Sequence, residues 1–214
     1  VLGGSSAING MIHIRGHPAD FDEWADTGLP EWSWNDVLPY FRRMEGQRCA
    51  MPDVYGSDGP IAISELPVRN RASEAFIDAA VSCGVARVRS FNLPRQEGAG
   101  YYQINTLRGF RCSASTAYLR PAAGRPNLAV VTGASVCSLR LEGRTAIAVE
   151  YDRGDGRRLA FARAEILVCG GAVGSPALLQ RSGIGHPGDL ASAEIQVRVA
   201  LPGVGRNLQD HFGV

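Results

Sequence analysis

Two glycine-rich stretches carry residue types that could bind an anion. Gly3–Ala7 combines small residues with serine hydroxyls, so its backbone can lie close to a flat ligand and its amides can bind phosphate. Gly170–Pro176 follows the apolar run Ile166–Cys169, which predicts a buried strand, a sharp turn and a helix with Ser175 as N-cap and Pro176 at its first position. A helix N-terminus of this kind can hold a phosphate. The alternatives are a flexible glycine-serine turn and an ordinary glycine-capped strand–helix junction.

The chain's four histidines are the residues that could transfer a proton near neutral pH. His13 lies inside an alternating apolar run, a position typical of a packing or hydrogen-bonding histidine. His17 lies in a turn and His186 follows a helix stop, so we expect both at the surface. His211 belongs to an Asn-Leu-Gln-Asp-His cluster, where we expect it to orient the chain. The pattern does not favour any of them as a base.

Composition excludes several functional classes. The net charge is +1, from 22 basic and 21 acidic residues, which argues against general attraction to nucleic acid or to an anionic membrane. All 22 basic residues are arginines, as is typical of high-GC bacteria. The five cysteines stand far apart without a C-x-x-C pair, so we expect buried free thiols and neither a zinc site nor a disulfide framework. No apolar run approaches membrane-spanning length, and we expect a cytoplasmic protein unless an upstream targeting segment exists.

Local signals predict the elements that must position these residues. Caps, breakers and apolar periodicity indicate helices from Pro18 to Gly28, after the capping box Ser33 to Asp36, and over Ser73–Cys83, Ser113–Leu119 and Pro187–Ala193.

Strands are predicted in two groups. Gly59–Ser64 and Tyr101–Leu107 flank the Ser73–Cys83 helix and indicate an α+β layer. Later in the chain, short strands separated by tight turns predict an antiparallel meander that leads into the Ile166–Cys169 strand, with one more strand at Val197–Val199. The strands of the meander region are Leu128–Thr132, Ser135–Leu141, Ala146–Tyr151 and Arg158–Ala162.

Together these pieces resemble the glucose-methanol-choline (GMC) family of flavin-dependent oxidoreductases, most closely its choline-dehydrogenase-like alcohol dehydrogenases. Leu2–Met11 matches the first signature of the family, and Gly171–Gly185 matches the second. Two long signatures at the proper separation are far more specific than a lone glycine motif. Supporting matches are Arg15-Gly16 with Asp20, Phe21, Asp22 and Trp24, then Trp32–Phe41, Ala117–Leu119 with Arg125–Leu128, and Gly203–His211.

The resemblance implies a fold and a cofactor. The fold is mixed α/β and α+β: a partial FAD-binding Rossmann-like domain with an antiparallel β-meander, plus part of an α+β substrate domain. Residues 1–19 and 114–214 would form the FAD-binding part, and residues 20–113 a lid and the first part of the substrate-binding domain. The implied FAD-binding residues are Gly3, Gly4, Ser5 and Ser6 beside the pyrophosphate, Asn9, Gly10 and Met11 near the isoalloxazine ring, Val136 at the adenine, and Ala172 at the turn.

The activity implied is oxidation of a small alcohol to an aldehyde or ketone, with hydride passing to flavin N5. In this family a histidine near the C-terminal end of the full chain takes the hydroxyl proton, and none of the four histidines matches it. The first strand with its G-x-G-x-x-G turn is also missing. We therefore expect a central fragment, inactive alone, that pairs with missing segments or another chain.

Two questions stay open at this stage. The alternative to an enzyme is a non-catalytic or degenerate flavoprotein fragment that acts as a structural or partner-binding module. Within the enzymatic interpretation, the sequence does not separate oxidase, dehydrogenase and lyase chemistry, and it does not identify the alcohol or the electron acceptor.

Overall fold

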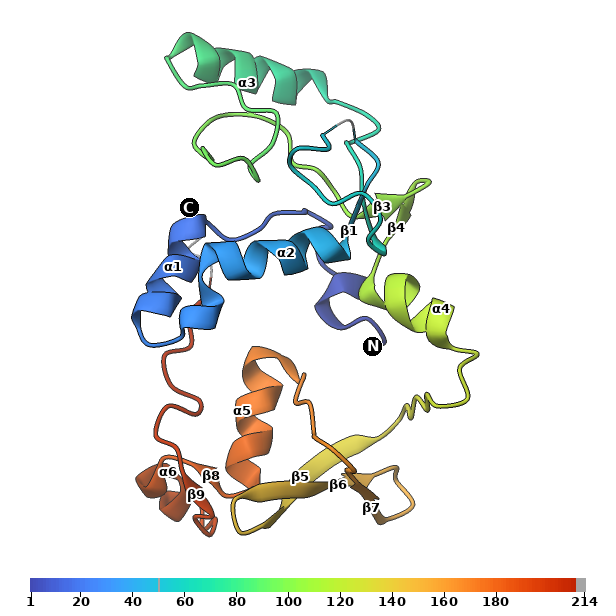
Figure 1. The fold of residues 1–214 in the computed structure, drawn as a ribbon, viewed down its shortest axis with the longest axis vertical. Helices are drawn as coiled ribbons and strands as arrows, with labels where there is room; N and C mark the ends of the chain where they lie inside the picture. The colour runs from blue at the N-terminus through green and yellow to red at the C-terminus, as the bar shows by residue number, and fades with distance from the viewer. Residues whose placement is uncertain (50, 211–214) are drawn as a thin grey trace. The chain divides into compact units, whose positions relative to one another are not determined.

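The computed structural model describes residues 1–49 and 51–210. Contacts divide the chain into two compact units, Val1–Leu128 and Ala129–Val214, and each is considered by itself (Figure 1). Helices and small sheets alternate along both units, so the mixed α/β and α+β fold class is confirmed. The boundaries between the FAD-binding and substrate-binding parts stay a prediction.

Three capped helices form most of the regular structure of the first unit. The helices predicted after Pro18 and Ser33 are confirmed as α1 (Pro18–Asp26) and α2 (Trp34–Met44). The third, α3 (Arg71–Ser82), begins two residues before the predicted start because Asn70 caps it, accepting a hydrogen bond from the Ala72 N–H at 2.8 Å. Shorter turns of helix are η1 (Gly4–Ala7), η2 (Pro30–Trp32), η3 (Ser115–Leu119) and α4 (Arg120–Ala122).

Aromatic rings join α1 to α2. The Phe21 ring lies 5.4 Å from that of Trp24, 5.6 Å from that of Trp34 and 5.7 Å from that of Phe41, measured between centroids. Edge and tilted arrangements at these distances are favourable. The tryptophans in this region therefore pack against neighbouring aromatic rings.

Two short sheets complete the first unit. β1 (Glu45–Gln47) pairs in parallel with β2 (Ile61–Ile63), and β3 (Thr106–Leu107) pairs antiparallel with β4 (Phe110–Arg111). The expected strand Tyr101–Leu107 is thus reduced to β3. The apolar core beside β2 consists of Cys49, Met51, Val54, Tyr55 and Ile63, with Leu93 packed against it.

The second unit contains the predicted meander. β5 (Ser135–Glu142), β6 (Thr145–Asp152) and β7 (Arg157–Phe161) form an antiparallel three-stranded sheet, and α5 (Gly171–Arg181) contacts β5 (Figure 1). After α5 the chain forms β8 (Ile184–Gly185), α6 (Pro187–Ser192) and β9 (Val199–Ala200), with β8 and β9 paired in parallel.

Two expected strands are wrong. Leu128–Thr132 and Ile166–Cys169 have no strand structure, and no strand among residues 1–49 and 51–210 pairs with either run. An apolar run becomes a strand only when a neighbour satisfies its backbone groups. Leu167 is 76% exposed as a result, so this run is not buried.

The start of α5 also differs from expectation. The N-cap is Gly170, and Ser175 and Pro176 lie inside the helix. The Ser175 Oγ accepts a hydrogen bond from the Gly170 N–H at 3.0 Å, which stabilises a start five residues earlier than predicted. Pro176 has no N–H to donate to the Ala172 carbonyl, so this first turn is held less tightly than an ordinary helical turn.

All five cysteines are free thiols. Cys49 and Cys112 are buried as expected, whereas Cys83 and Cys169 are exposed, so the expectation of buried thiols is wrong for these two. Among the residues that the structure describes, no helix combines the length and apolar character needed to cross a membrane.

Candidate cofactor site

The first glycine-rich stretch forms a tight turn against the segment after β4. Gly3 has φ 93° and Gly4 has φ 55°, both left-handed. A Cβ on Gly3 would lie 3.2 Å from the Cβ of Ser115, so this position needs glycine for space as well as for conformation. A Cβ on Gly4 or Gly10 would meet nothing within 4 Å, so their open sides are free to approach a ligand.

Ser6 fixes this turn from inside. Its hydroxyl donates to the Gly3 carbonyl and accepts from the Ala114 N–H at 2.9 Å. The Ser6 hydroxyl is therefore engaged by the backbone, whereas Ser5 is exposed and its side chain has no partner among the described residues. Of the two serines, Ser5 is the one with a hydroxyl available to a ligand.

Arg111 on β4 clamps the far end of the same loop. Its Nη1 donates to the Ser6 carbonyl at 3.2 Å, to the Asn9 carbonyl at 2.8 Å and to Asn9 Oδ1 at 2.9 Å. The sequence interpretation missed Arg111, since 102 residues separate it from Asn9. No local spacing signals such a contact.

Asn9 and Met11 shape the loop end that the resemblance assigns to the flavin ring. Asn9 Oδ1 accepts from the Met11 N–H at 3.1 Å, and the Met11 carbonyl accepts from the Asn105 N–H at 2.7 Å. Met11 has φ 63°, an uncommon conformation for a residue with a side chain. Such strain persists only when surrounding contacts hold it, and it concentrates at functional sites.

The second glycine-rich stretch borders an open groove in the second unit. The groove has a volume of about 570 Å³ and lies between the first turns of α5 and residues 205–209. Gly171 has φ 81° with nothing within 4 Å of a built Cβ, and Val173 is 71% exposed. Ala172, the residue implied by the resemblance, lines this groove together with Pro176, Gln180 and Leu208.

Val136 lies near the start of β5. It pairs with Tyr151 of β6, and its carbonyl accepts a hydrogen bond from Arg181 Nη2 at 3.3 Å. The side chain is 38% exposed. The predicted FAD-binding residues thus form one group in each unit, a loop at Gly3–Met11 and a surface at Val136 and Ala172, and their role stays a prediction.

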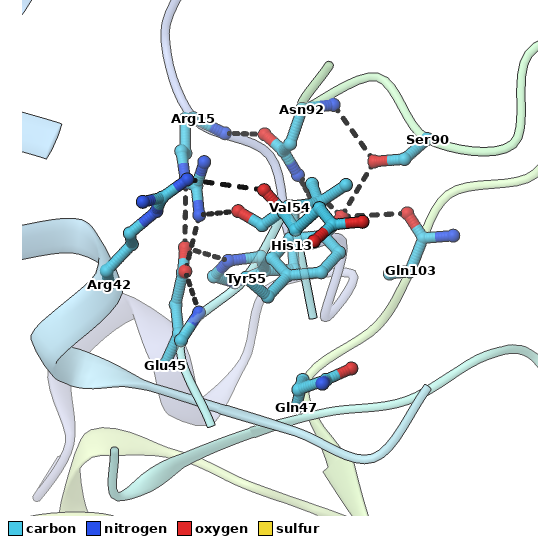
Figure 2. A network of polar contacts seen from close by, with 12 residues as sticks. His13, Arg15, Arg42, Glu45, Gln47, Val54, Tyr55, Ser90, Asn92 and Gln103 are labelled. Carbon is cyan, nitrogen blue, oxygen red and sulfur yellow. Dashed lines mark hydrogen bonds and ion pairs between the residues drawn. The ribbon is translucent and has the colours of Figure 1, made fainter. Parts of the chain in front are cut away.

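A buried polar network, invisible to sequence inspection, underlies the first group (Figure 2). Glu45 at the start of β1 has no exposed surface, and its carboxylate accepts four hydrogen bonds. Arg15 donates two of them, from Nε to Oε1 at 2.8 Å and from Nη2 to Oε2. His13 Nε2 donates to Oε1 at 3.1 Å, and the Gly56 N–H donates to Oε2 at 3.1 Å.

The hydrogen-bond partners fix the tautomer of His13 and the ionisation of Glu45. Asn105 Nδ2 can only donate, so His13 Nδ1 accepts from it at 3.0 Å and His13 Nε2 carries the proton given to Glu45. Burial alone would raise the pKa of Glu45. The hydrogen bonds from His13 and Arg15 and the Gly56 N–H, with the Arg15 charge, outweigh it and lower that pKa.

Tyr55 and Asn92 extend the network (Figure 2). The Tyr55 hydroxyl lies 2.9 Å from each of Ser90 Oγ, Gln103 Oε1 and Asn92 Nδ2. Asn92 in turn accepts from the Arg15 N–H at 2.6 Å and donates to the His13 carbonyl at 3.1 Å. Burial raises the pKa of Tyr55, so its hydroxyl stays protonated at neutral pH. We interpret this network as the framework that fixes the irregular segment after Met11, residues 12–15.

Three of the four histidines lie where the sequence predicts, one buried and two at the surface. His13 is a buried, hydrogen-bonded histidine, 7% exposed. His17 and His186 are N-caps, accepting from the Ala19 N–H at 3.1 Å and from the Asp189 N–H at 3.4 Å. His211 lies outside the described residues.

Comparisons with known proteins agree with these features. The profile of the family described as GMC oxidoreductase matches residues 1–213. The "Oxygen-dependent choline dehydrogenase" of Burkholderia ambifaria is 45% identical over 214 residues, which cover 99% of this chain and 38% of that protein. The protein of the same name from Burkholderia pseudomallei is 46% identical over 215 residues, with the same coverage.

Solved structures show the same fold. An FAD-dependent oxidoreductase from Chaetomium thermophilum superposes with a TM-score of 0.91 at 31% identity, covering 98% of this chain and 39% of that one. Pyridoxine 4-oxidase from "Mesorbium loti" gives a TM-score of 0.86 at 35% identity, covering 92% of this chain and 39% of the other. The chain therefore spans less than two fifths of the length of these relatives, and along that length it belongs to the GMC oxidoreductase family.

Proposed function

We propose that the protein containing this chain is an FAD-dependent oxidoreductase that oxidises the CH–OH group of a small alcohol to an aldehyde or ketone. The observation that carries the proposal is the 45% identity to choline dehydrogenases over 99% of the chain. It is supported by the relatives named as an FAD-dependent oxidoreductase and as pyridoxine 4-oxidase. A choline-like alcohol is the substrate class we propose first.

The chain's own residues fit FAD. A dinucleotide needs backbone that can approach it closely, and Gly4, Gly10 and Gly171 present open sides. FAD, when bound, supplies the hydride acceptor of the reaction. Gly3, Gly4, Ser5 and Ser6 would hold its pyrophosphate, and Asn9, Gly10 and Met11 would border its ring. The family resemblance assigns Val136 to the adenine and Ala172 to the cofactor as well.

The roles of this chain's residues are binding and orientation. Arg111 and Ser6 fix the loop, and the Met11 carbonyl is tied to Asn105. The buried network around Glu45 holds the irregular segment that follows the loop, through His13 and Arg15. We propose that the base taking the hydroxyl proton lies outside these 214 residues. A cytoplasmic location and pairing with a further segment or chain are also proposals.

The test uses the full polypeptide that contains this chain. We expect a visible flavin spectrum after unbound flavin is removed, and anaerobic bleaching of that spectrum by choline. Tetramethylammonium, which carries the same cationic group without a CH–OH, should leave the spectrum unchanged. A colourless protein that does not take up added FAD would contradict the cofactor assignment. A bound flavin that no alcohol reduces would contradict the reaction and favour the non-catalytic module.

A further inference from the structure

A pocket of about 250 Å³ in the second unit is lined by three arginines from three segments. Arg140 lies on β5, Arg181 is the last residue of α5, and Arg198 comes directly before β9. Among the described residues, none of those that line this pocket is acidic or aromatic. The pocket shares no lining residue with the groove at Ala172.

Two of the three arginine charges are not neutralised by an acidic partner. Arg140 Nη2 lies 3.1 Å from Glu150 Oε1 and is thereby paired. The Arg181 side chain donates to the carbonyls of Val136 and Cys137, which are neutral acceptors. Arg198 makes no side-chain hydrogen bond or ion pair with any residue that the structure describes. Like charges around one concavity repel, and a bound anion removes that cost.

The backbone fixes the segments that carry these arginines. Gly183 has φ 81°, and a Cβ there would lie 2.7 Å from Arg198 Cγ, so glycine lets the Arg198 side chain lie against the end of α5. The Arg198 N–H donates to the Gly183 carbonyl at 2.8 Å. Ser182 Oγ accepts from the Leu139 N–H at 2.8 Å and joins the same helix end to β5. The arginines therefore extend from segments that are hydrogen-bonded to one another.

We propose that Arg140, Arg181 and Arg198 form a binding site for a compact phosphate-type dianion. Guanidinium groups match phosphate oxygens with charge-assisted, often bidentate hydrogen bonds. The lining offers no ring on which a nucleobase could stack, which favours inorganic phosphate or a small phosphate ester over a nucleotide. The site goes beyond the proposed alcohol oxidation and does not depend on it.

The test is titration of the full polypeptide with potassium phosphate by calorimetry, at constant ionic strength set with chloride. We expect saturable binding, weakened about tenfold by Arg198→Gln because one charge-assisted contact is lost. Arg144→Gln is the matched control. Arg144 lies exposed in the turn between β5 and β6 and does not line the pocket, so this substitution removes the same charge outside it. Arg198→Lys keeps the charge and should weaken binding less than Arg198→Gln does.

Three results would overturn the site. The first is an absence of saturable phosphate binding to a folded protein. The second is equal weakening by Arg198→Gln and Arg144→Gln, which would show only a general charge effect. The third is loss of phosphate binding once the protein is loaded with FAD, which would make the pocket part of the cofactor site. Substituting glycerol 3-phosphate for inorganic phosphate then separates a free ion from an ester as the preferred source.

Discussion

Arg15 holds both carboxylate oxygens of Glu45 inside the first unit. The guanidinium Nε lies 2.8 Å from Oε1 and Nη2 contacts Oε2, with the Arg15 side chain 3% exposed and that of Glu45 0% exposed. Arg15 Nη2 also donates to the Val54 carbonyl at 2.9 Å. A buried pair of this kind depends on full hydrogen bonding, because either charge alone would be costly to bury.

Removing the charge of Glu45 should strongly destabilise the first unit. In Glu45→Gln the amide NH₂ must face a donor, because all four groups around the carboxylate donate, and Arg15 is left as an uncompensated buried charge. We expect the free energy of unfolding to fall by about 3 to 5 kcal/mol. Urea unfolding followed by tryptophan fluorescence measures this unit, since Trp24, Trp32 and Trp34 all lie in it.

The matched control is the exposed pair between Glu65 and Arg69. Arg69 Nη2 lies 3.2 Å from Glu65 Oε2, and both side chains are about half exposed. Solvent-exposed pairs contribute little, so Glu65→Gln should cost less than about 1 kcal/mol. Equal losses for the two variants would contradict a special role for the buried pair.

Glu45 should also make the first unit sensitive to acid. Burial opposes ionisation, but the hydrogen bonds from His13, Arg15 and Gly56 prevail and lower the pKa of Glu45 in the folded state. A carboxylate with a lowered folded pKa stabilises the fold at pH values above its unfolded pKa, which is about 4.3. That stability is lost as the pH falls below this value toward the folded pKa. Urea midpoints measured from pH 7 downward should drop there, and Glu45→Gln should flatten the drop.

The features that the sequence predicts correctly are those with local causes. α1 and α2 follow from caps within three residues of their first turns, and the meander follows from tight turns between short apolar runs. The run Ile166–Cys169 fails because a strand also needs a partner, which no local pattern supplies. The prediction of Ser175 as N-cap is wrong because the helix begins earlier. The Ser175 hydroxyl, five residues after Gly170, accepts a hydrogen bond from the Gly170 N–H from inside the helix.

In the candidate cofactor site too, the features with local causes are predictable from the sequence and the long-range contacts are not. Glycine-rich loops at Gly3 and Gly171 are visible in the sequence, because positive φ and close approach demand glycine. Arg111 and Glu45 are not visible, since they act on loops 102 and 30 residues away. Long-range polar contacts leave no periodic signal, and only the folded arrangement identifies them.

The Ser182 hydroxyl should stabilise the second unit by joining the end of α5 to β5. Its hydroxyl accepts from the Leu139 N–H at 2.8 Å and donates to the Leu178 carbonyl at 2.7 Å. In Ser182→Ala the Leu139 N–H, on a residue 7% exposed, loses its acceptor, so we expect a loss of about 1 to 3 kcal/mol. Hydrogen exchange of the Leu139 amide should accelerate accordingly.

Ser192→Ala serves as the comparison for this prediction. Ser192 Oγ donates to the Gly188 carbonyl at 2.9 Å at an exposed position, where water can replace it. Its removal should change stability by no more than about 0.5 kcal/mol. Unchanged Leu139 exchange in Ser182→Ala would show that the helix end is held to β5 by other contacts.

Gly4 and Gly109 offer a direct test of the proposed FAD loop. Both have left-handed backbones, with φ 55° and 81°, and a Cβ on either would meet nothing within 4 Å. Alanine should therefore cost each position a similar backbone strain of about 1 to 2 kcal/mol.

Only Gly4 lies in the loop proposed to run beside the FAD pyrophosphate. In the full polypeptide we expect Gly4→Ala to weaken FAD binding about tenfold and Gly109→Ala to leave it unchanged, measured by fluorescence quenching of added FAD. Equal FAD affinities in the two variants would place the cofactor away from Gly4, because strain and folding are matched between them.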